Sequence, residues 1–183
     1  MSAFDALAFI EIASIARGYV TLDRLVKKAS VAVRFARPVT PGKFIILFSG
    51  DLANVEESFL EAEESAQSTL LDSLLLPFAH PKLLPAIEAK VGRSAGESLA
   101  VVELTHLAST LLAADLALKT SATSLMKMHL AIGIGGKGYF TLSGPLGDIE
   151  VAIDALVERI PPERIVACEV IPNPHRETRG FFS

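Results

Sequence analysis

Residues 7–27 read LAFIEIASIARGYVTLDRLVK, and residues 99–119 read LAVVELTHLASTLLAADLALK. When the two stretches are aligned without a gap at an offset of 92, six positions carry the same residue. Most of the other positions exchange one apolar residue for another. The match resumes after a two-residue insertion and ends with LPFAH (76–80) over IPNPH (171–175). The chain therefore consists of two copies of one unit of roughly 80 residues.

Each copy predicts the same order of strands and helices. A short apolar run rich in Ile, Val and Phe opens each copy, at 5–12 and at 99–104, as is typical of strands. A helical pattern follows, then two strand-like runs around a turn, a second amphipathic helix and a last strand. The hairpin runs are 31–49 and 125–143, and the last strands are 72–78 and 164–171. The order β-α-β-β-α-β, found twice, predicts an α+β fold of two tandem ferredoxin-like units, each with both helices on one face of an open sheet.

The repeat also predicts the domain boundaries. We expect a first domain at residues 1–88 and a second at residues 98–183. The intervening residues, 89–97, lie within the stretch AKVGRSAGES and are expected to be a linker because this stretch is rich in Gly, Ser and Ala.

The composition argues against several classes of protein. The 183 residues carry 17 Lys and Arg against 21 Asp and Glu, a formal charge of −4 that disfavours binding to nucleic acids or anionic membranes by bulk charge. The apolar runs are too often interrupted to span a bilayer, which takes about 20 residues. The N-terminus lacks a basic segment, so we expect no signal peptide and an intracellular protein. The mean hydropathy of +0.43 is high for a free monomer, so the excess apolar surface must be buried somewhere.

Motifs that could carry chemistry have weak support. GIGGKG (133–138) matches a dinucleotide fingerprint, but strand-like residues follow it where the fingerprint needs a helix. His106 and His129 have no carboxylate or thiol at ligand spacing. The single cysteine, Cys168, cannot form an internal disulfide and lies in an alternating strand, as buried thiols often do. We therefore expect no catalytic site, no metal site and no cofactor.

Charge is segregated along the chain. Glu11 and Glu103 are repeated acids of the first strands, and we expect each to bond to the backbone or to neighbouring residues. The two hairpins carry basic residues and no acid, among them Lys43 and Lys137 beside the turns. If the turns converged in an assembly, the opening between them would be electropositive.

The two units, with ALAFIEI…DRLVKKA…TPGKFIILFSGD in the first and LAVVELT…DLALKTS…IGGKGYFTLSG…IPNPH in the second, resemble the bacterial microcompartment shell domain. The resemblance covers about residues 4–80 and 98–182, in the standard, unpermuted strand order. It is closest to the tandem-domain class, whose members form homotrimers that imitate a hexamer. It implies a structural protein of the microcompartment shell, located in the cytoplasm, that tiles with other shell hexamers, trimers and pentamers and passes small metabolites through a central pore.

The resemblance also implies roles for particular residues. The pore turns would be formed by Thr40, Pro41, Gly42, Ile134, Gly135 and Gly136, flanked by the basic residues Lys43 and Lys137. The lateral edge would be formed by Lys27, Lys119, His80 and His175. Many family members carry Arg between the two prolines of the last motif, where this chain has Phe78 and Asn173. Some tandem members hold an iron–sulfur cluster on pore-turn cysteines; these turns have none, so no cluster is expected.

Two alternatives remain open from the sequence. A trimeric small-molecule-sensing regulator on the same scaffold would bind effectors between subunits and would not form sheets or closed particles. An enzyme would need a convergent polar cluster, and the sequence does not indicate one.

Overall fold

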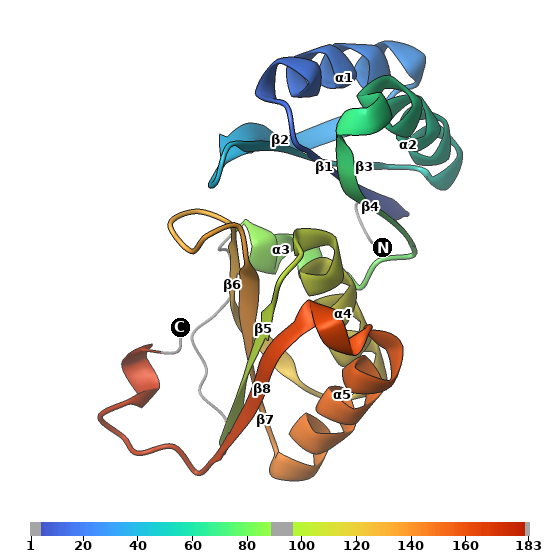
Figure 1. Cartoon of the computed structure of the whole chain (residues 1–183). Coiled ribbons are helices and arrows are strands. Elements are labelled where there is room, and N and C mark those ends of the chain that lie inside the picture. Colours follow the sequence, from blue (N-terminus) through green and yellow to red (C-terminus); the bar gives the residue numbers. More distant parts are fainter. Residues whose placement is uncertain (1–4, 89–96, 182–183) are drawn as a thin grey trace. The chain divides into compact units, whose positions relative to one another are not determined.

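The computed structural model describes residues 5–88 and 97–181 (Figure 1). Contacts divide the chain into two compact units, the first ending at Ala79 and the second beginning at His80. Residues 80–88, which the sequence analysis grouped with the first half, therefore pack with the second unit. Of the expected linker, residues 89–96 lie outside the described residues. Within the described ranges, no helix is both long enough and apolar enough to cross a membrane.

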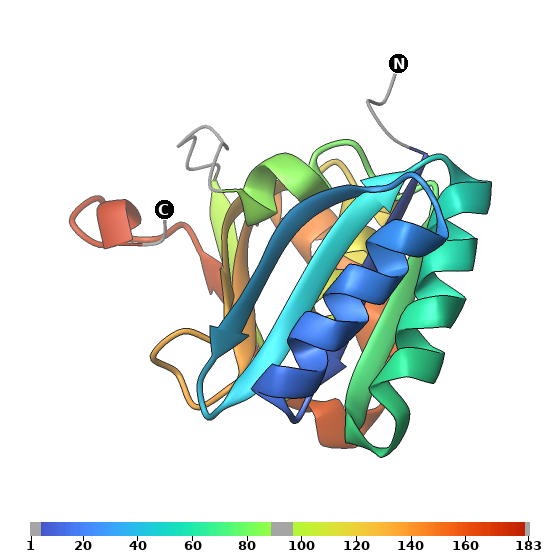
Figure 2. The same ribbon diagram turned by 90° about the horizontal axis from the view of Figure 1, so that it is seen from above.

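The first unit has the predicted order of elements. These are β1 (Ala6–Ile12), α1 (Ile15–Lys28), β2 (Ala32–Val39), β3 (Lys43–Gly50), α2 (Leu52–Ala66), a 3₁₀ helix (Gln67–Thr69) and β4 (Leu70–Pro77). The strands pair antiparallel in the order β2-β3-β1-β4, which places β3 and β1 at the centre. Both helices lie on one face of this sheet (Figures 1 and 2). The prediction of a ferredoxin-like unit is confirmed.

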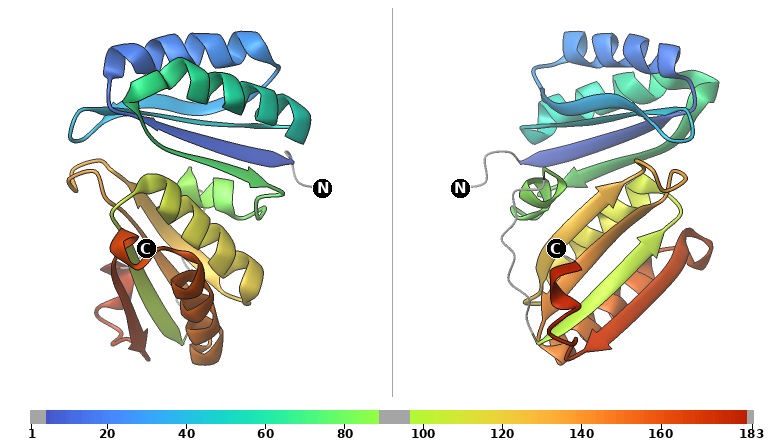
Figure 3. Two further views of the ribbon diagram at one scale, coloured as in Figure 1. Left: turned by 45° about the vertical axis from the view of Figure 1, so that its right-hand side comes forward. Right: turned by 90° about the vertical axis from the view of Figure 1, so that its left-hand side faces the viewer.

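The second unit repeats this topology. Its elements are α3 (Leu83–Ile87), β5 (Ser98–Leu104), α4 (Leu107–Thr120), β6 (Ser124–Leu130), β7 (Gly138–Gly144), α5 (Leu146–Arg159), a 3₁₀ helix (Pro162–Arg164), β8 (Ile165–Pro172) and a last 3₁₀ helix (Arg179–Phe181). The antiparallel sheet has the order β6-β7-β5-β8, which matches the first sheet strand for strand. Figure 3 shows α4 and α5 together on one face of it. The short helix α3 was not predicted.

The two sheets share their irregularities as well as their order. The pairing of β1 with β4 shifts register after Glu11, and the pairing of β5 with β8 shifts at the equivalent Glu103. The hairpins shift register after Val33 and after Leu125, which are also equivalent. A β-bulge bends and twists the strand that carries it. The duplication therefore preserves the shape of the sheet in both units.

Local sequence fixes where the helices begin. The side chain of Ser14 accepts a hydrogen bond from the N–H of Arg17 at 3.2 Å, and that of Asp51 accepts from the N–H of Asn54 at 3.1 Å. Each cap provides a partner for an N–H group that has none within the helix. The bonds from Asn54 also hold the pKa of Asp51 below its usual value.

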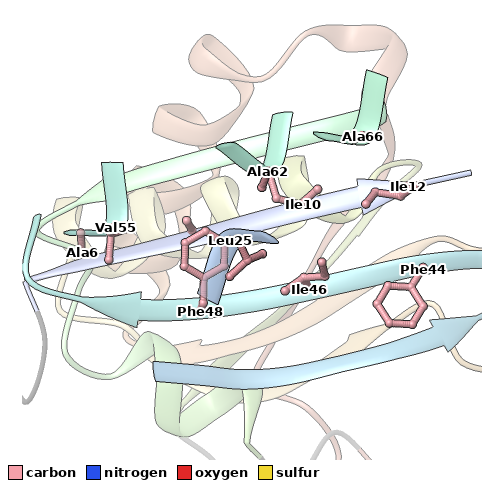
Figure 4. Close-up of a cluster of buried hydrophobic side chains, with 11 residues drawn as sticks. Ala6, Ile10, Ile12, Leu25, Phe44, Ile46, Phe48, Val55, Ala62 and Ala66 are labelled. Atoms are coloured by element: carbon pink, nitrogen blue, oxygen red, sulfur yellow. The ribbon is translucent and has the colours of Figure 1, made fainter. Parts of the chain in front are cut away.

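The core of the first unit lies between its helices and its sheet (Figure 4). Alternate residues of β1 face the helices, as the two-residue period of a strand requires. Figure 4 shows Ala6, Ile10, Ile12, Leu25, Phe44, Ile46, Phe48, Val55, Ala62 and Ala66 in this cluster. The intervening β1 residues Leu7, Phe9 and Glu11, on the opposite face, are buried too.

The buried faces of two helices are narrower than the apolar periodicity predicted. In α1 the buried residues are Gly18, Thr21 and Leu25, whereas the apolar side chain of Val26 is exposed. In α5 the apolar Val157 is likewise exposed. The apolar stripe of each helix is thus wider than the surface that its own unit covers.

Candidate pore and edge residues

A tight turn joins β2 to β3 at residues 40–42. Val39 pairs with Lys43, and the N–H of Gly42 donates to the carbonyl of Val39 at 2.8 Å. Gly42 has φ +110°, a conformation that side chains rarely adopt, and an added Cβ would meet nothing within 4 Å. Glycine is therefore needed at position 42 because of its backbone conformation, and not because a side chain there would clash with neighbouring atoms. Thr40 and Pro41, joined by a cis peptide bond, are exposed with it.

The equivalent turn of the second unit is longer. Leu130 pairs with Gly138, so residues 131–137 form the loop between β6 and β7. Ala131 and three glycines, Gly133, Gly135 and Gly136, have positive φ, and the N–H of Ala131 donates to the carbonyl of Lys137 at 2.9 Å. The two-residue insertion found in the sequence lies in this loop.

The loop places the predicted pore residues in different environments. Gly135 is exposed, Ile134 is half-buried and Gly136 is buried. Ile132, which the sequence analysis did not select, is exposed at the loop surface. An apolar residue next to the glycines was the signal that could have identified it. The Nε2 atom of His129 lies 2.6 Å from the carbonyl oxygen of Ile132, and the His129 ring stacks on Tyr139.

Each basic residue beside a turn is paired with the repeated acid of a first strand. Lys43 Nζ donates to Glu11 Oε1 at 2.7 Å, and Lys137 Nζ donates to Glu103 Oε1 at 2.8 Å. The two pairs differ in burial: the Glu11 side chain is fully buried, whereas that of Glu103 is 36% exposed. The second oxygen of Glu11, Oε2, is buried and has no hydrogen-bond partner in the described part of the chain.

These pairs change the expected electrostatics of the hairpins. The sequence analysis found no acid within either hairpin and expected an electropositive opening. Since β1 and β5 supply a carboxylate to each lysine, Lys43 and Lys137 bring little uncompensated charge to the turns. The expectation that Glu11 and Glu103 bond to neighbouring residues agrees with this geometry.

The four predicted edge residues lie on α1, on α4 and after the last strands. Lys27 Nζ donates to Asp23 at 2.6 Å one turn earlier on α1, and both side chains are exposed. Lys119 makes the same pair with Asp115 on α4 at 2.6 Å, but Asp115 is buried. The two edges are therefore equivalent in sequence and different in environment.

The remaining candidates have local roles. The glycines of 133–138 precede strand β7 and open no helix, in agreement with the rejection of a dinucleotide site. The Thr105 hydroxyl lies 2.8 Å from Nδ1 of His106. Burial raises the pKa of the Cys168 thiol. Within residues 5–88 and 97–181, no group of three or more His, Cys, Asp and Glu side chains could hold a metal ion.

Comparison with known proteins identifies the family. The model of the BMC domain matches residues 6–79 and again residues 98–174. The chain belongs to the BMC-domain family. It is 33% identical over 172 residues to the bacterial microcompartment shell protein PduT of Citrobacter freundii, a match that covers 93% of this chain and 94% of that protein.

Solved structures of microcompartment proteins agree with this assignment. A protein from Desulfitobacterium hafniense superimposes with a TM-score of 0.87 and 36% identity over 97% of this chain and 99% of that one. A fused permuted hexameric shell protein from the RMM microcompartment has the same fold, with a TM-score of 0.63 and 22% identity over 84% of this chain and 82% of that one.

This chain is thus a structural protein of a bacterial microcompartment shell with two BMC domains in tandem, as the resemblance predicted. Its relatives favour this role over the small-molecule-sensing regulator that the sequence left open.

Proposed function

We propose that three copies of the chain close into a ring of six BMC domains and that such rings pack edge to edge in the shell layer. The observation that carries this proposal is the duplication itself: two units with the same strand order, the same bulges and a turn at the same place. Closed rings need like units related by rotation, and a chain with two such units completes a six-membered ring as a trimer.

In this ring the two turns alternate around a central opening. Residues 40–42 and the longer loop that includes Ile134, Gly135 and Gly136 would form its rim, and small metabolites would cross it. Lys27, Lys119, His80 and His175 would lie at the outer edge, against rings of the same protein or of companion shell hexamers, trimers and pentamers. The proposal assigns no catalytic step to the chain, in keeping with its shell-protein relatives.

The oligomeric state tests the proposal directly. Native mass spectrometry at micromolar concentration should give three times the 19.5 kDa mass of the chain. Electron microscopy of the same sample should show six-lobed discs with a central hole, and sheets of discs when the protein is concentrated. A monomer or dimer, or a trimer without a hole, would contradict the proposal.

A test of metabolite passage through the opening needs a variant that changes the charge at the rim and leaves the fold intact. Lys137→Glu is suitable because its partner Glu103 is partly exposed. Lys43→Glu is not, because it would set a second carboxylate beside buried Glu11. Lys137→Glu would leave two carboxylates, its own and that of Glu103, without a paired cation beside the turn. Shells assembled with Lys137→Glu should therefore admit a small anionic substrate more slowly than shells with Lys137→Arg. Equal anion flux through the Lys137→Glu and Lys137→Arg shells would show that the charge at residue 137 does not affect selectivity.

A further inference from the structure

The chain carries two arms of equivalent sequence, each following the last strand of a repeat. The first arm is residues 78–87 and the second arm is residues 173–181. Their equivalent pairs are Phe78 and Asn173, His80 and His175, Lys82 and Glu177, and Leu83 and Thr178. The first residue of each arm has a left-handed φ, +54° and +49°. The arms therefore leave their strands through the same backbone turn, even though Phe seldom adopts this conformation.

The two arms continue with the same hydrogen bonds. In each, the histidine carbonyl accepts from the N–H three residues later, at 2.9 Å in both arms. The histidine Nδ1 accepts from the N–H two residues later, at 3.2 Å in the first arm and 3.4 Å in the second. The arms thus share a local conformation as well as a sequence position.

The first arm is docked on the unit that follows it in the chain. The N–H of His80 donates to Asp115 Oδ1 on α4 at 2.7 Å. Leu83 and Leu84 are buried, and their helix α3 packs against β6 and α4. Asp115 accepts from Lys119 with its other oxygen, so this one carboxylate holds both the arm and the edge lysine.

The first unit exposes the surface that corresponds to this docking site. Asp23 occupies the position of Asp115 but is exposed, with its carboxylate bound to Lys27. Along the same helix, Tyr19 is 57% exposed and Val26 is 43% exposed. Their equivalents on α4, Leu111 and Leu118, are buried. The apolar stripe that is exposed on α1 of the first unit is therefore buried on the equivalent helix, α4, of the second unit.

The second arm is correspondingly exposed. Thr178, the equivalent of buried Leu83, is exposed, and Phe181, the equivalent of buried Ala86, is 82% exposed. The first arm docks on the next repeat along the chain, but no repeat follows the second arm in the described residues. In a closed ring the next repeat is the first unit of another copy.

We propose that the second arm of each chain docks on α1 and β2 of a second copy, where the N–H of His175 donates to Asp23 and Phe181 packs against the exposed apolar stripe of α1. This inference rests on the proposed function, because a closed trimer provides a next repeat for every arm. The partner is a second copy of this chain, and the contact would link the three subunits in a circle.

Site-directed cross-linking tests the contact. Two chains, Asp23→Cys and His175→Cys, are made in a Cys168→Ser background, which removes the single native thiol, and are co-expressed with different tags. A short thiol cross-linker should join the two chains when both variants are present and should give no dimer with either variant alone. The control chain His80→Cys/Asp115→Cys should lose its free thiols without forming a covalent dimer, since this contact lies within one chain.

Assembly measurements separate this inference from the proposal beneath it. Asp23→Ala should raise the concentration at which trimers dissociate by about tenfold or more, because three charge-assisted hydrogen bonds are lost. Asp23→Asn keeps an acceptor and should have a smaller effect, and Phe181→Ala should weaken the trimer without changing the circular dichroism. If the wild type forms stable trimers but the Asp23→Cys and His175→Cys chains fail to cross-link, or if Asp23→Ala and Phe181→Ala leave the trimer unchanged, the arm contact alone is overturned. A monomeric wild type would overturn the ring and the arm contact together.

Discussion

Replacing Lys43 by Met should destabilise the protein far more than the same change at Lys137. The two lysines hold equivalent carboxylates at 2.7 and 2.8 Å, so the pairs are alike in distance and differ mainly in burial. Glu11 is fully buried, and its Oε2 already has no hydrogen-bond partner in the described part of the chain. Without Lys43 the carboxylate would be buried with neither oxygen paired to a cation.

The expected magnitudes follow from the cost of an unpaired buried charge. Removing one partner of a buried ion pair costs about 3–5 kcal/mol, whereas a partly exposed pair contributes about 0–1 kcal/mol. For a chain of 183 residues that unfolds in one transition, 1 kcal/mol shifts the melting temperature by roughly 2–4 °C. Lys43→Met should therefore lower the melting temperature by roughly 6–20 °C, and Lys137→Met by less than about 4 °C.

Thermal and urea denaturation of the two variants, at one fixed protein concentration, measure the difference. The concentration is fixed because assembly adds to the apparent stability. The double variant Glu11→Leu/Lys43→Met should recover most of the loss, since an apolar pair in place of a buried ion pair is often neutral or stabilising. Equal effects of Lys43→Met and Lys137→Met, or a double variant no better than Lys43→Met, would refute the reasoning.

Three further outcomes are expected. Gly18→Ala should lower the free energy of unfolding, measured in urea, by about 1–3 kcal/mol because the added Cβ would overlap the ring of Phe44. Gly147→Ala is the control: it lies in open space at the start of α5, so this change should be neutral or slightly stabilising. Burial, opposed by a nearby carboxylate, holds the pKa of His80 below its usual 6.5. The unfolded chain therefore binds this proton more readily than the folded chain, and the free energy of unfolding should fall as the pH drops through about 6.5. Unfolding measured from about pH 7.5 to 5.5 should show a less steep fall for His80→Gln. Because burial raises the pKa of Cys168, iodoacetamide should modify this thiol more slowly at about pH 8 in the folded protein than in urea, and a folded rate equal to the unfolded rate would contradict its burial.

The fold could be predicted because the duplication doubled every weak signal. A single hairpin or amphipathic run is ambiguous, but residues 7–27 and 99–119 specify the same order of elements twice. The turns at 40–42 and 134–136 followed from glycines between apolar runs, although the second loop is longer than predicted and spans residues 131–137. These local patterns depend on residues that are close in sequence, and sequence reasoning reads such patterns well.

The charge pairs could not be predicted in the same way. Glu11 lies 32 residues before Lys43, and Glu103 lies 34 residues before Lys137. Counting charges within each hairpin missed them because the acids are on neighbouring strands, and strand order and register decide which residues meet. The docking of α3 was missed for a related reason: a five-residue apolar segment has too little periodicity to predict a helix or its partner.

The unequal lengths of the two hairpin turns have a consequence for how the rim of the proposed trimer can change. In a ring of six identical chains, one substitution alters all six rim segments at once. Here the proline turn and the glycine loop occupy separate codons of one gene, so a mutation in the loop appears three times and leaves the other three segments as they were. Evolution, or a protein engineer, can thereby change three of the six rim segments at a time and so adjust the aperture in smaller increments.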